Sequence, residues 1–379
     1  VISAMAARCF TRSSQRINTW IDDAGPSDCV ALKNGILNLS ELFKTADEPN
    51  ETRILLPHTS NFFSTICLPY EFDPAAKCPT WLHFLNTSFN SDYEQIDTLQ
   101  KWFGLQLTPI TRFQKMLFVI GPPRSGKGTI ERTLVAMLGR ETVATPSIND
   151  LADKWALHSL IDRTVAIISD ARLSNRADGV AITEKLLSIT GEDSQDIQRK
   201  YMDTLKAVKL QVRFTLFSNM LPSLKDQSTA FLTRTIFLAM PNSYVGKEDI
   251  YLGDKIMQEL PGILNWAIAG RFRLLEENKF TQPTAGRKLV NQFRLAMSPV
   301  SAFIEDKCDP EGEVEVRELY QAYCDWCTES DQANKQDITS FGKSLHAILS
   351  TVEKVRSTKG SRPYIYRGIS LKSAAATGF

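Results

Sequence analysis

Short apolar runs alternate with longer amphipathic stretches between residues 113 and 275. Strands that are covered on both faces of a sheet need apolar side chains at every position. Four runs have this character, at 116–120, 164–169, 212–218 and 235–239. The stretches between them carry apolar residues at helical spacing. Strands that alternate with helices in this way predict an α/β fold with a parallel sheet.

The flanking regions have a different pattern. Residues 1–110 combine short elements, with helices predicted to begin near Trp81 and Asp92, and prolines break the stretch before them. Residues 276–300 are polar and interrupted by proline, which predicts a linker. Helices are predicted after it, at 301–307, 314–328 and 338–350, and two short strands follow. This order indicates a winged helix. We therefore expect three domains, a mixed and mostly helical one at 1–110, the α/β core at 111–280 and a winged-helix-like one at 281–379.

A glycine-rich turn follows the first core strand. The sequence GPPRSGKGT matches the phosphate-binding pattern G-x-x-x-x-G-K-[ST] with one residue displaced, because Gly128 separates Lys127 from Thr129. In such a loop backbone N–H groups cradle the phosphates, the lysine contacts the β- and γ-phosphates, and the hydroxyl binds Mg²⁺. A chance glycine turn is the alternative interpretation. The turn predicts a site for ATP with Mg²⁺ made by Gly121, Pro122, Pro123, Arg124, Ser125, Gly126, Lys127, Gly128 and Thr129.

Polar residues stand at the ends of the next two core strands. Asp170 could bind Mg²⁺ together with Thr129, or it could cap the next helix or turn. Asn219 could orient the attacking water, or it could form an Asx turn. Ala171 follows Asp170, where a second acid would be expected. Asp170 therefore serves both metal and water, or Glu184 or Glu192 assists it.

Basic residues outside the loop could also serve an ATPase. Arg199, Lys200 and Lys206 lie between the second and third core strands and suit contact with a nucleic-acid backbone, although a solvated charged face is the usual explanation. Arg234 precedes the last core strand, where it could reach the nucleotide of a neighbouring subunit or pair with an acid of its own subunit. A C-terminal basic group could bind DNA or form a soluble surface, and it comprises Lys354, Arg356, Lys359, Arg362, Arg367 and Lys372.

Composition limits the class of protein. The 379 residues carry a net charge of +1, so any site for a polyanion must come from local clustering. No apolar stretch reaches the about 18 residues of a membrane helix, and no signal peptide is evident, so we expect an intracellular protein without a membrane partner. Seven scattered cysteines suit a reducing compartment. For the pair Cys324 and Cys327, packing on a helix is favoured over a zinc site with Cys308 and His346.

An ordered set of motifs resembles a known family. GPPRSGKGT, ISDARL, LLSITGED with RKY, LFSNMLP and ELPGILNWAIAG have the order and spacing of the superfamily 3 helicase part of phage and plasmid primase-helicases, which is related to the poxvirus-type primase-helicase. The resemblance extends to nearly the whole chain through NGILNL, YEFDPAAKCPTWLHFL, LQKWFG and VRELYQAYCDWC.

The resemblance implies an AAA+-like P-loop ATPase core that assembles as a ring, usually a hexamer, and translocates 3′→5′ on single-stranded DNA. The implied partners are single-stranded or forked DNA, further copies of the chain, and a primase domain or protein. The implied location is the cytoplasm of a bacterial host. Roles carried over by position are phosphate and Mg²⁺ binding by Lys127 and Thr129, a Walker B acid at Asp170, a sensor at Asn219, a DNA-contacting hairpin with Arg199 and Lys200, and an arginine finger at Arg234.

Two other functions fit the same motifs. A replication initiator that binds DNA with ATP but does not unwind it would have nearly the same sequence. A nucleoside monophosphate kinase also contains G-K-G-T. Such kinases begin near the phosphate-binding loop, whereas more than a hundred residues precede it here.

Overall fold

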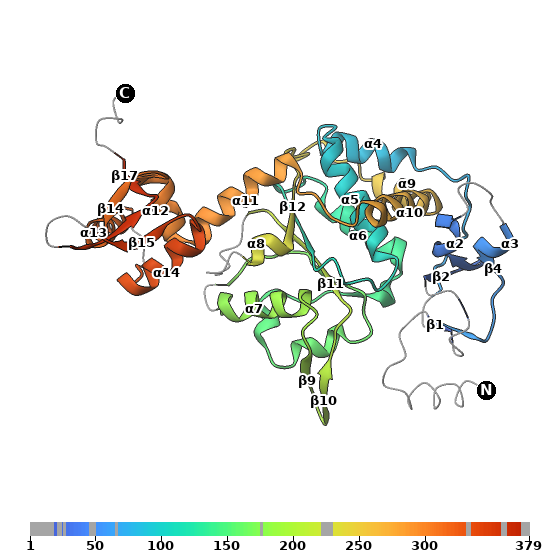
Figure 1. Cartoon of the computed structure of the whole chain (residues 1–379). Helices are drawn as coiled ribbons and strands as arrows, with labels where there is room; N and C mark the ends of the chain where they lie inside the picture. Colours follow the sequence, from blue (N-terminus) through green and yellow to red (C-terminus); the bar gives the residue numbers. More distant parts are fainter. Residues whose placement is uncertain are drawn as a thin grey trace. The chain divides into compact units, whose positions relative to one another are not determined.

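The computed structural model describes residues 19–20, 25, 28–44, 51–64, 67–174, 177–220, 230–330, 335–357 and 362–372. The chain divides into two compact units (Figure 1). Unit 1 comprises Val1–Pro222 and Arg234–Arg287, and unit 2 comprises Ser223–Thr233 and Lys288–Phe379. The predicted domain boundaries at residues 110 and 280 stay predictions.

Unit 1 is built on a five-stranded parallel sheet. Its strands lie in the order β12 (Thr235–Ala239), β6 (Met116–Ile120), β11 (Arg213–Ser218), β8 (Val165–Ile168) and β7 (Val143–Ala144). The four longer strands are the apolar runs that the sequence predicts, and β7 is a two-residue strand too short to leave a pattern. The predicted α/β class with a parallel sheet is confirmed.

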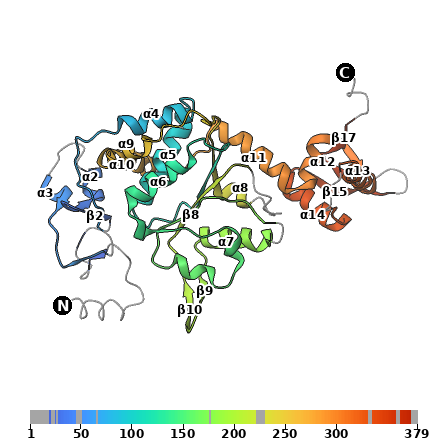
Figure 2. The same ribbon diagram turned by 180° about the vertical axis from the view of Figure 1, so that it is seen from behind.

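Helices cover both faces of this sheet, which explains its continuous apolar strands. Leu117 and Val119 belong to one hydrophobic cluster with residues of α5 (Tyr93–Gln106), α6 (Lys127–Leu138) and α10 (Leu260–Glu277). Figures 1 and 2 show these three helices on one side of the sheet and α7 (Gly179–Thr190) on the other. The phosphate-binding loop therefore sits on a rigid support between β6 and α6.

The segments before β6 are tied to the core by polar contacts. α4 (Pro79–Ser88) has no side-chain cap of its own, and the Glu259 carboxylate instead accepts hydrogen bonds from the N–H groups of Thr80 and Trp81, each 3.0 Å long. Residues 28–56 add an antiparallel sheet to the predicted helices. The elements here are β1 (Thr19–Trp20), β2 (Cys29–Leu32), β3 (Gly35–Asn38), α2 (Leu39–Lys44), α3 (Glu51–Ile54), β4 (Leu55–Leu56) and β5 (Phe62–Phe63).

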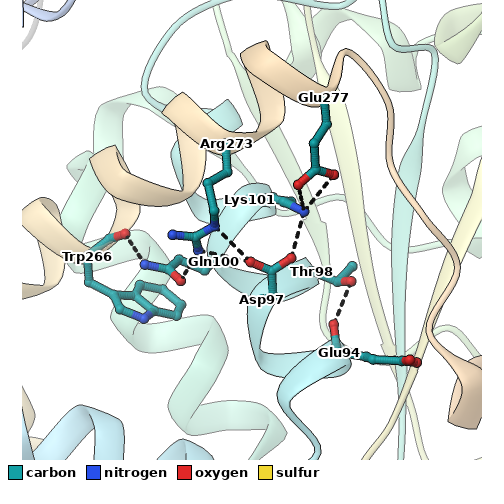
Figure 3. Close-up of polar contacts among 8 residues, drawn as sticks. All are labelled: Glu94, Asp97, Thr98, Gln100, Lys101, Trp266, Arg273 and Glu277. Atoms are coloured by element: carbon teal, nitrogen blue, oxygen red, sulfur yellow. Dashed lines mark hydrogen bonds and ion pairs between the residues drawn. The ribbon is translucent and has the colours of Figure 1, made fainter. Parts of the chain in front are cut away.

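An ion-pair cluster joins α5 to α10 (Figure 3). The Lys101 ammonium is almost completely buried and lies 2.6 Å from Asp97 and 2.8 Å from Glu277. Arg273 extends the cluster by pairing with Asp97 at 2.9 Å. Its guanidinium also donates to the side chain of Gln100. A buried ammonium is tolerated only when it is paired, so these contacts fix the two helices against each other.

The remaining elements of unit 1 connect the strands. Short 3₁₀ helices lie at Arg140–Thr142, Asn149–Ala152 and Ala156–Leu160, and α9 spans Leu252–Met257. Strands β9 (Gln195–Arg199) and β10 (Met202–Val208) form a hairpin between α7 and β11. α8 (Ala230–Arg234), whose first four residues belong to unit 2, precedes β12 in the sequence.

Unit 2 has the element order of a winged helix. The helices are α12 (Pro299–Lys307), α13 (Val316–Glu329) and α14 (Ile338–Ile348), and the strands are β13 (Cys308–Asp309), β14 (Glu313–Glu315), β15 (Glu353–Arg356), β16 (Tyr364–Arg367) and β17 (Ser370–Leu371). Strand β16 lies between β14 and β15 in an antiparallel sheet. Tyr323 and Phe341 pack in its core at a centroid distance of 4.7 Å.

The predicted linker at 276–300 is wrong over most of its length, because Thr284–Met297 form helix α11. The segment is polar overall, but Leu289, Val290 and Phe293 recur at helical spacing. Phe293 is fully buried and stacks on Phe231 with a centroid distance of 5.4 Å. Across the residues that the structure describes, none of the helices is both long and apolar enough to span a bilayer.

Candidate nucleotide site and basic hairpin

Two glycines shape the loop between β6 and α6. Gly126 caps the N-terminus of α6 with φ +101°, a conformation that glycine adopts without strain. A Cβ at this position would lie 2.8 Å from the ring of Phe84. A Cβ at Gly121 would lie 2.6 Å from the carbonyl oxygen of Met240, at the end of the neighbouring strand β12. The glycines therefore allow a tight turn against α4 and β12, which aims the first N–H groups of α6 into the loop.

The side chain of Lys127, the first residue of α6, folds back onto the loop. Its Nζ donates hydrogen bonds to the carbonyl oxygens of Gly121 (2.6 Å) and Pro122 (2.8 Å) and to Ser125 Oγ (3.1 Å). Burial lowers the pKa of this ammonium. A cation held by three oxygen acceptors in a phosphate-binding loop is suited to exchange them for phosphate oxygens.

The outer side of the loop is braced by the segment after β12. Ser243 Oγ donates to the carbonyl of Pro123 over 2.8 Å, and the Tyr244 N–H donates to the carbonyl of Arg124 over 3.0 Å. Arg124 is also 3.6 Å from Glu248. These contacts tie the outer side of the loop to the segment that follows β12.

The carboxyl ends of three strands meet beside the loop. β11 lies between β6 and β8, and its tip contacts both neighbours. The Gly121 N–H donates to the Ser218 carbonyl over 3.2 Å, and the Ala171 N–H donates to the Phe217 carbonyl over 2.8 Å. Asp170 and Asn219 are exposed at this same edge. The structure therefore brings both polar strand ends to the phosphate-binding loop, as the sequence predicts for parallel strands.

Asp170 is paired with Arg172, two residues further along the chain. Its carboxylate accepts hydrogen bonds from Arg172 Nε and Nη2, the shortest of 2.6 Å. This bidentate pair lowers the pKa of the Asp170 carboxyl, so the group is ionised at neutral pH. Thr129 contacts a second cation, since Arg132 Nη2 lies 3.4 Å from its hydroxyl.

Sequence reasoning also missed Glu131. It lies on α6, four residues after Lys127 and hence on the same helix face. Its carboxylate accepts a 2.6 Å hydrogen bond from the hydroxyl of Ser169, the residue before Asp170. This contact places a second acid beside the end of β8. The pattern T-x-E at the start of α6 could have indicated it, because Thr129 and Glu131 are two residues apart.

The acids that the sequence suggested as assistants lie elsewhere. Glu184 is exposed on α7. Glu192 accepts a hydrogen bond from Thr111, which precedes β6 and so lies at the amino end of the sheet. Of these acids, only Glu131 reaches the residue next to Asp170, through its hydrogen bond with Ser169.

Arg234 lies at the amino ends of the sheet strands, whereas the loop lies at their carboxyl ends. It precedes β12, whose first residue Thr235 pairs with Met116 at the start of β6. Its Nη1 donates a 2.7 Å hydrogen bond to the carbonyl of Leu187 in the last turn of α7. Arg234 is therefore not close to the nucleotide site of its own chain.

The predicted DNA-contacting residues lie on the β9–β10 hairpin. Figure 1 shows this hairpin extending away from the sheet of unit 1. Lys200 and Lys206 are exposed, and the Arg199 guanidinium donates two hydrogen bonds, of 3.0 and 2.9 Å, to the carbonyl of Asp203. The cations therefore lie on a projecting strand pair that comes between β8 and β11 in the sequence.

Thr129 and Asp170 carry oxygen donors. The Thr129 hydroxyl and the Asp170 carboxylate are oxygen ligands of the kind Mg²⁺ prefers when a phosphate supplies the others. No group of three or more His, Cys, Asp or Glu side chains suited to a metal occurs in the described part of the chain. Cys324 and Cys327 are buried on α13 in the core of unit 2, which matches the favoured interpretation of that pair.

Comparison with known proteins supports the fold. Residues 119–234 match the model of a family of unknown function, DUF5906. Among solved structures, the A form of the apo NrS-1 C-terminal region is similar with a TM-score of 0.52 at 12% identity, covering 89% of this chain and 93% of that chain. A further apo structure of that region has a TM-score of 0.50 at 12% identity, covering 89% and 92%. The comparison with curated proteins gives no match.

Proposed function

We propose that this chain is the ATP-hydrolysing motor of a replicative DNA helicase, the helicase part of a primase-helicase, which works as a ring of identical subunits on single-stranded or forked DNA. One observation carries the proposal. The phosphate-binding loop, Asp170 and Asn219 lie at the carboxyl ends of neighbouring strands, and the basic hairpin lies in the sequence between β8 and β11, the strands that bear these two residues.

In this proposal the loop holds the β- and γ-phosphates, and Lys127 exchanges the carbonyls of Gly121 and Pro122 for phosphate oxygens. Bound Mg²⁺ would neutralise charge that develops on the phosphates. Thr129 and Asp170 would hold it. Asp170 is already ionised, and it would have to share its carboxylate with Arg172 and the metal.

Water activation requires a base close to the γ-phosphate. Ser169 links the two acids, because its hydroxyl donates a hydrogen bond to Glu131 and Asp170 is the next residue in the chain. Asn219 would orient the water from the neighbouring strand. We assign Glu131 the role of the second acid that the chain lacks after Asp170.

Ring assembly would complete the site. Arg234 lies at the sheet edge opposite to its own loop, so it would act on the nucleotide of a neighbouring subunit. Reaching that nucleotide requires Arg234 to release the Leu187 carbonyl. Such a release would couple the nucleotide to α7, which leads directly into the β9–β10 hairpin.

The test is ATP hydrolysis with and without single-stranded DNA, read beside the mass of the protein in solution. DNA should stimulate hydrolysis, and the mass should correspond to a closed oligomer. Lys127→Ala should abolish turnover, because the ammonium of Lys127 would neutralise negative charge on the transferred phosphate. Lys33→Ala is the matched control, because Lys33 is an exposed lysine paired with Glu71. Turnover that survives in Lys127→Ala would remove the loop from the mechanism.

A strand-displacement assay separates the two DNA-dependent alternatives. A motor should release the complementary strand of a forked duplex with ATP but not with a non-hydrolysable analogue. ATP-dependent binding without release would assign an initiator. Phosphoryl transfer to nucleoside monophosphates, in place of hydrolysis, would assign a kinase.

A further inference from the structure

The tip of the β9–β10 hairpin breaks a rule of turn chemistry. Arg199 pairs with Met202 across the strands, which leaves Lys200 and Tyr201 as a two-residue turn. Tyr201 has φ +60°. Glycine or asparagine is favoured where the second central residue of a turn has positive φ. A bulky side chain is strained at such a position. The fold would be served better by a smaller residue at position 201.

Burial does not compensate for this strain. Tyr201 is fully exposed, and the following Met202 is 61% exposed. An exposed aromatic ring keeps its apolar surface in water, which is unfavourable. Both the backbone conformation and the exposure of Tyr201 therefore oppose stability, and residues that break local rules without a structural gain concentrate at functional sites.

The charges around the ring indicate its ligand. Lys200 adjoins Tyr201, and Lys206 lies on the same hairpin. The Arg199 guanidinium is held on the hairpin by its two hydrogen bonds to the Asp203 carbonyl. Cations that contact phosphates beside an aromatic ring that stacks on bases are the combination used by proteins that bind single strands. A paired duplex does not offer the faces of its bases.

We infer that Tyr201 stacks on an unpaired nucleobase while Lys200 contacts the adjacent phosphate. The inference rests on the proposed function and adds to it direct contact with bases at the hairpin tip. Because every base has a flat face, this grip is tolerant of sequence but requires that bases be present.

The experiment uses the whole chain and two oligonucleotides of equal length, one of thymidines and one in which the central bases are missing but the phosphates remain. The measured quantity is the ratio of the two Kd values at fixed salt. Four proteins are compared: wild type, Tyr201→Asn, Tyr201→Phe and Lys200→Ala. Asparagine suits the positive φ, so Tyr201→Asn should keep or raise the thermal midpoint.

Wild type should favour the thymidine strand, and the ratio should fall by about fivefold or more in Tyr201→Asn, since base stacking on one aromatic side chain is of that size. Tyr201→Phe should keep the wild-type ratio because the ring remains. Lys200→Ala should weaken both strands alike and flatten the salt dependence by about 0.7 in log–log slope.

A wild-type ratio near one, or a ratio unchanged in Tyr201→Asn, would overturn the inference while leaving DNA-stimulated hydrolysis intact. A solution mass that changes in Tyr201→Asn with an unchanged ratio would also overturn it, because the tip would then contact a neighbouring subunit. Absence of DNA binding and of DNA-stimulated hydrolysis in the wild type would instead refute the proposed function itself.

Discussion

The hydroxyl of Ser169 donates a 2.6 Å hydrogen bond to the carboxylate of Glu131, although 38 residues separate them along the chain. This bond joins the end of β8 to the first turns of α6. It brings an acid from the phosphate-binding helix to the strand end that carries Asp170. The site therefore has two carboxylates next to the loop, one from each element.

Glu131→Gln should lower the rate of ATP hydrolysis by about a hundredfold or more, since a general base contributes at least that much. Glutamine retains an oxygen for Ser169, so the fold and ATP affinity should be preserved. Turnover and nucleotide Kd measured separately would show this. Glu184→Gln, on the exposed part of α7, is the control and should match wild type. Equal turnover in both variants would leave Asp170 as the only base.

Substitutions of two loop glycines should differ in kind. Gly126→Ala should destabilise the protein, because it combines φ +101° with a Cβ 2.8 Å from the Phe84 ring. At Gly128 a Cβ meets only the flexible guanidinium of Arg132, at 3.2 Å. Gly128→Ala should therefore keep the thermal midpoint and weaken only nucleotide binding. Thermal melting with and without ATP distinguishes the two effects, and a low midpoint for Gly128→Ala would contradict this account.

Lys101→Met should lower the free energy of unfolding by about 2 kcal/mol, because Asp97 and Glu277 lose a charged hydrogen-bond donor. Lys33→Met is the matched change at an exposed pair, 3.7 Å from Glu71, and should cost less than about 0.5 kcal/mol. Urea unfolding curves of the two variants give the comparison. Similar losses in both would show that the cluster between α5 and α10 does not stabilise the protein.

Buried cysteines should resist alkylation. Burial raises the pKa of the Cys29 thiol to about 11 and that of Cys78 and Cys308 to about 12, so all three are protonated at pH 8. Cys67 is exposed and should react with iodoacetamide in the native protein. Peptide mapping before and after denaturation would show the difference. Since unfolding lowers these three pKa values, stability should fall as the pH rises from about 9 toward 11.

The core strands were predictable because both faces of the sheet are covered, and this leaves continuous apolar runs such as that of β6. The loop was predictable because phosphate binding requires glycine, lysine and a hydroxyl in a fixed order. Helix α11 was missed because the polar residues and Pro283 before it hide the helical spacing of Leu289, Val290 and Phe293. The cap of α4 was unpredictable, since Glu259 reaches Thr80 across 179 residues.

The sequence by itself determined the four longer core strands, the chemistry of the loop, and the placement of Asp170 and Asn219 at strand ends. These features depend on local pattern, because burial and turn geometry act on neighbouring residues. Only the tertiary structure decided that Arg172 pairs with Asp170, that Glu131 reaches Ser169, and that Arg234 faces away from its own loop. Side-chain pairing of this kind depends on strand register and on how each helix is rotated against the sheet, and neither is encoded in the spacing of a motif.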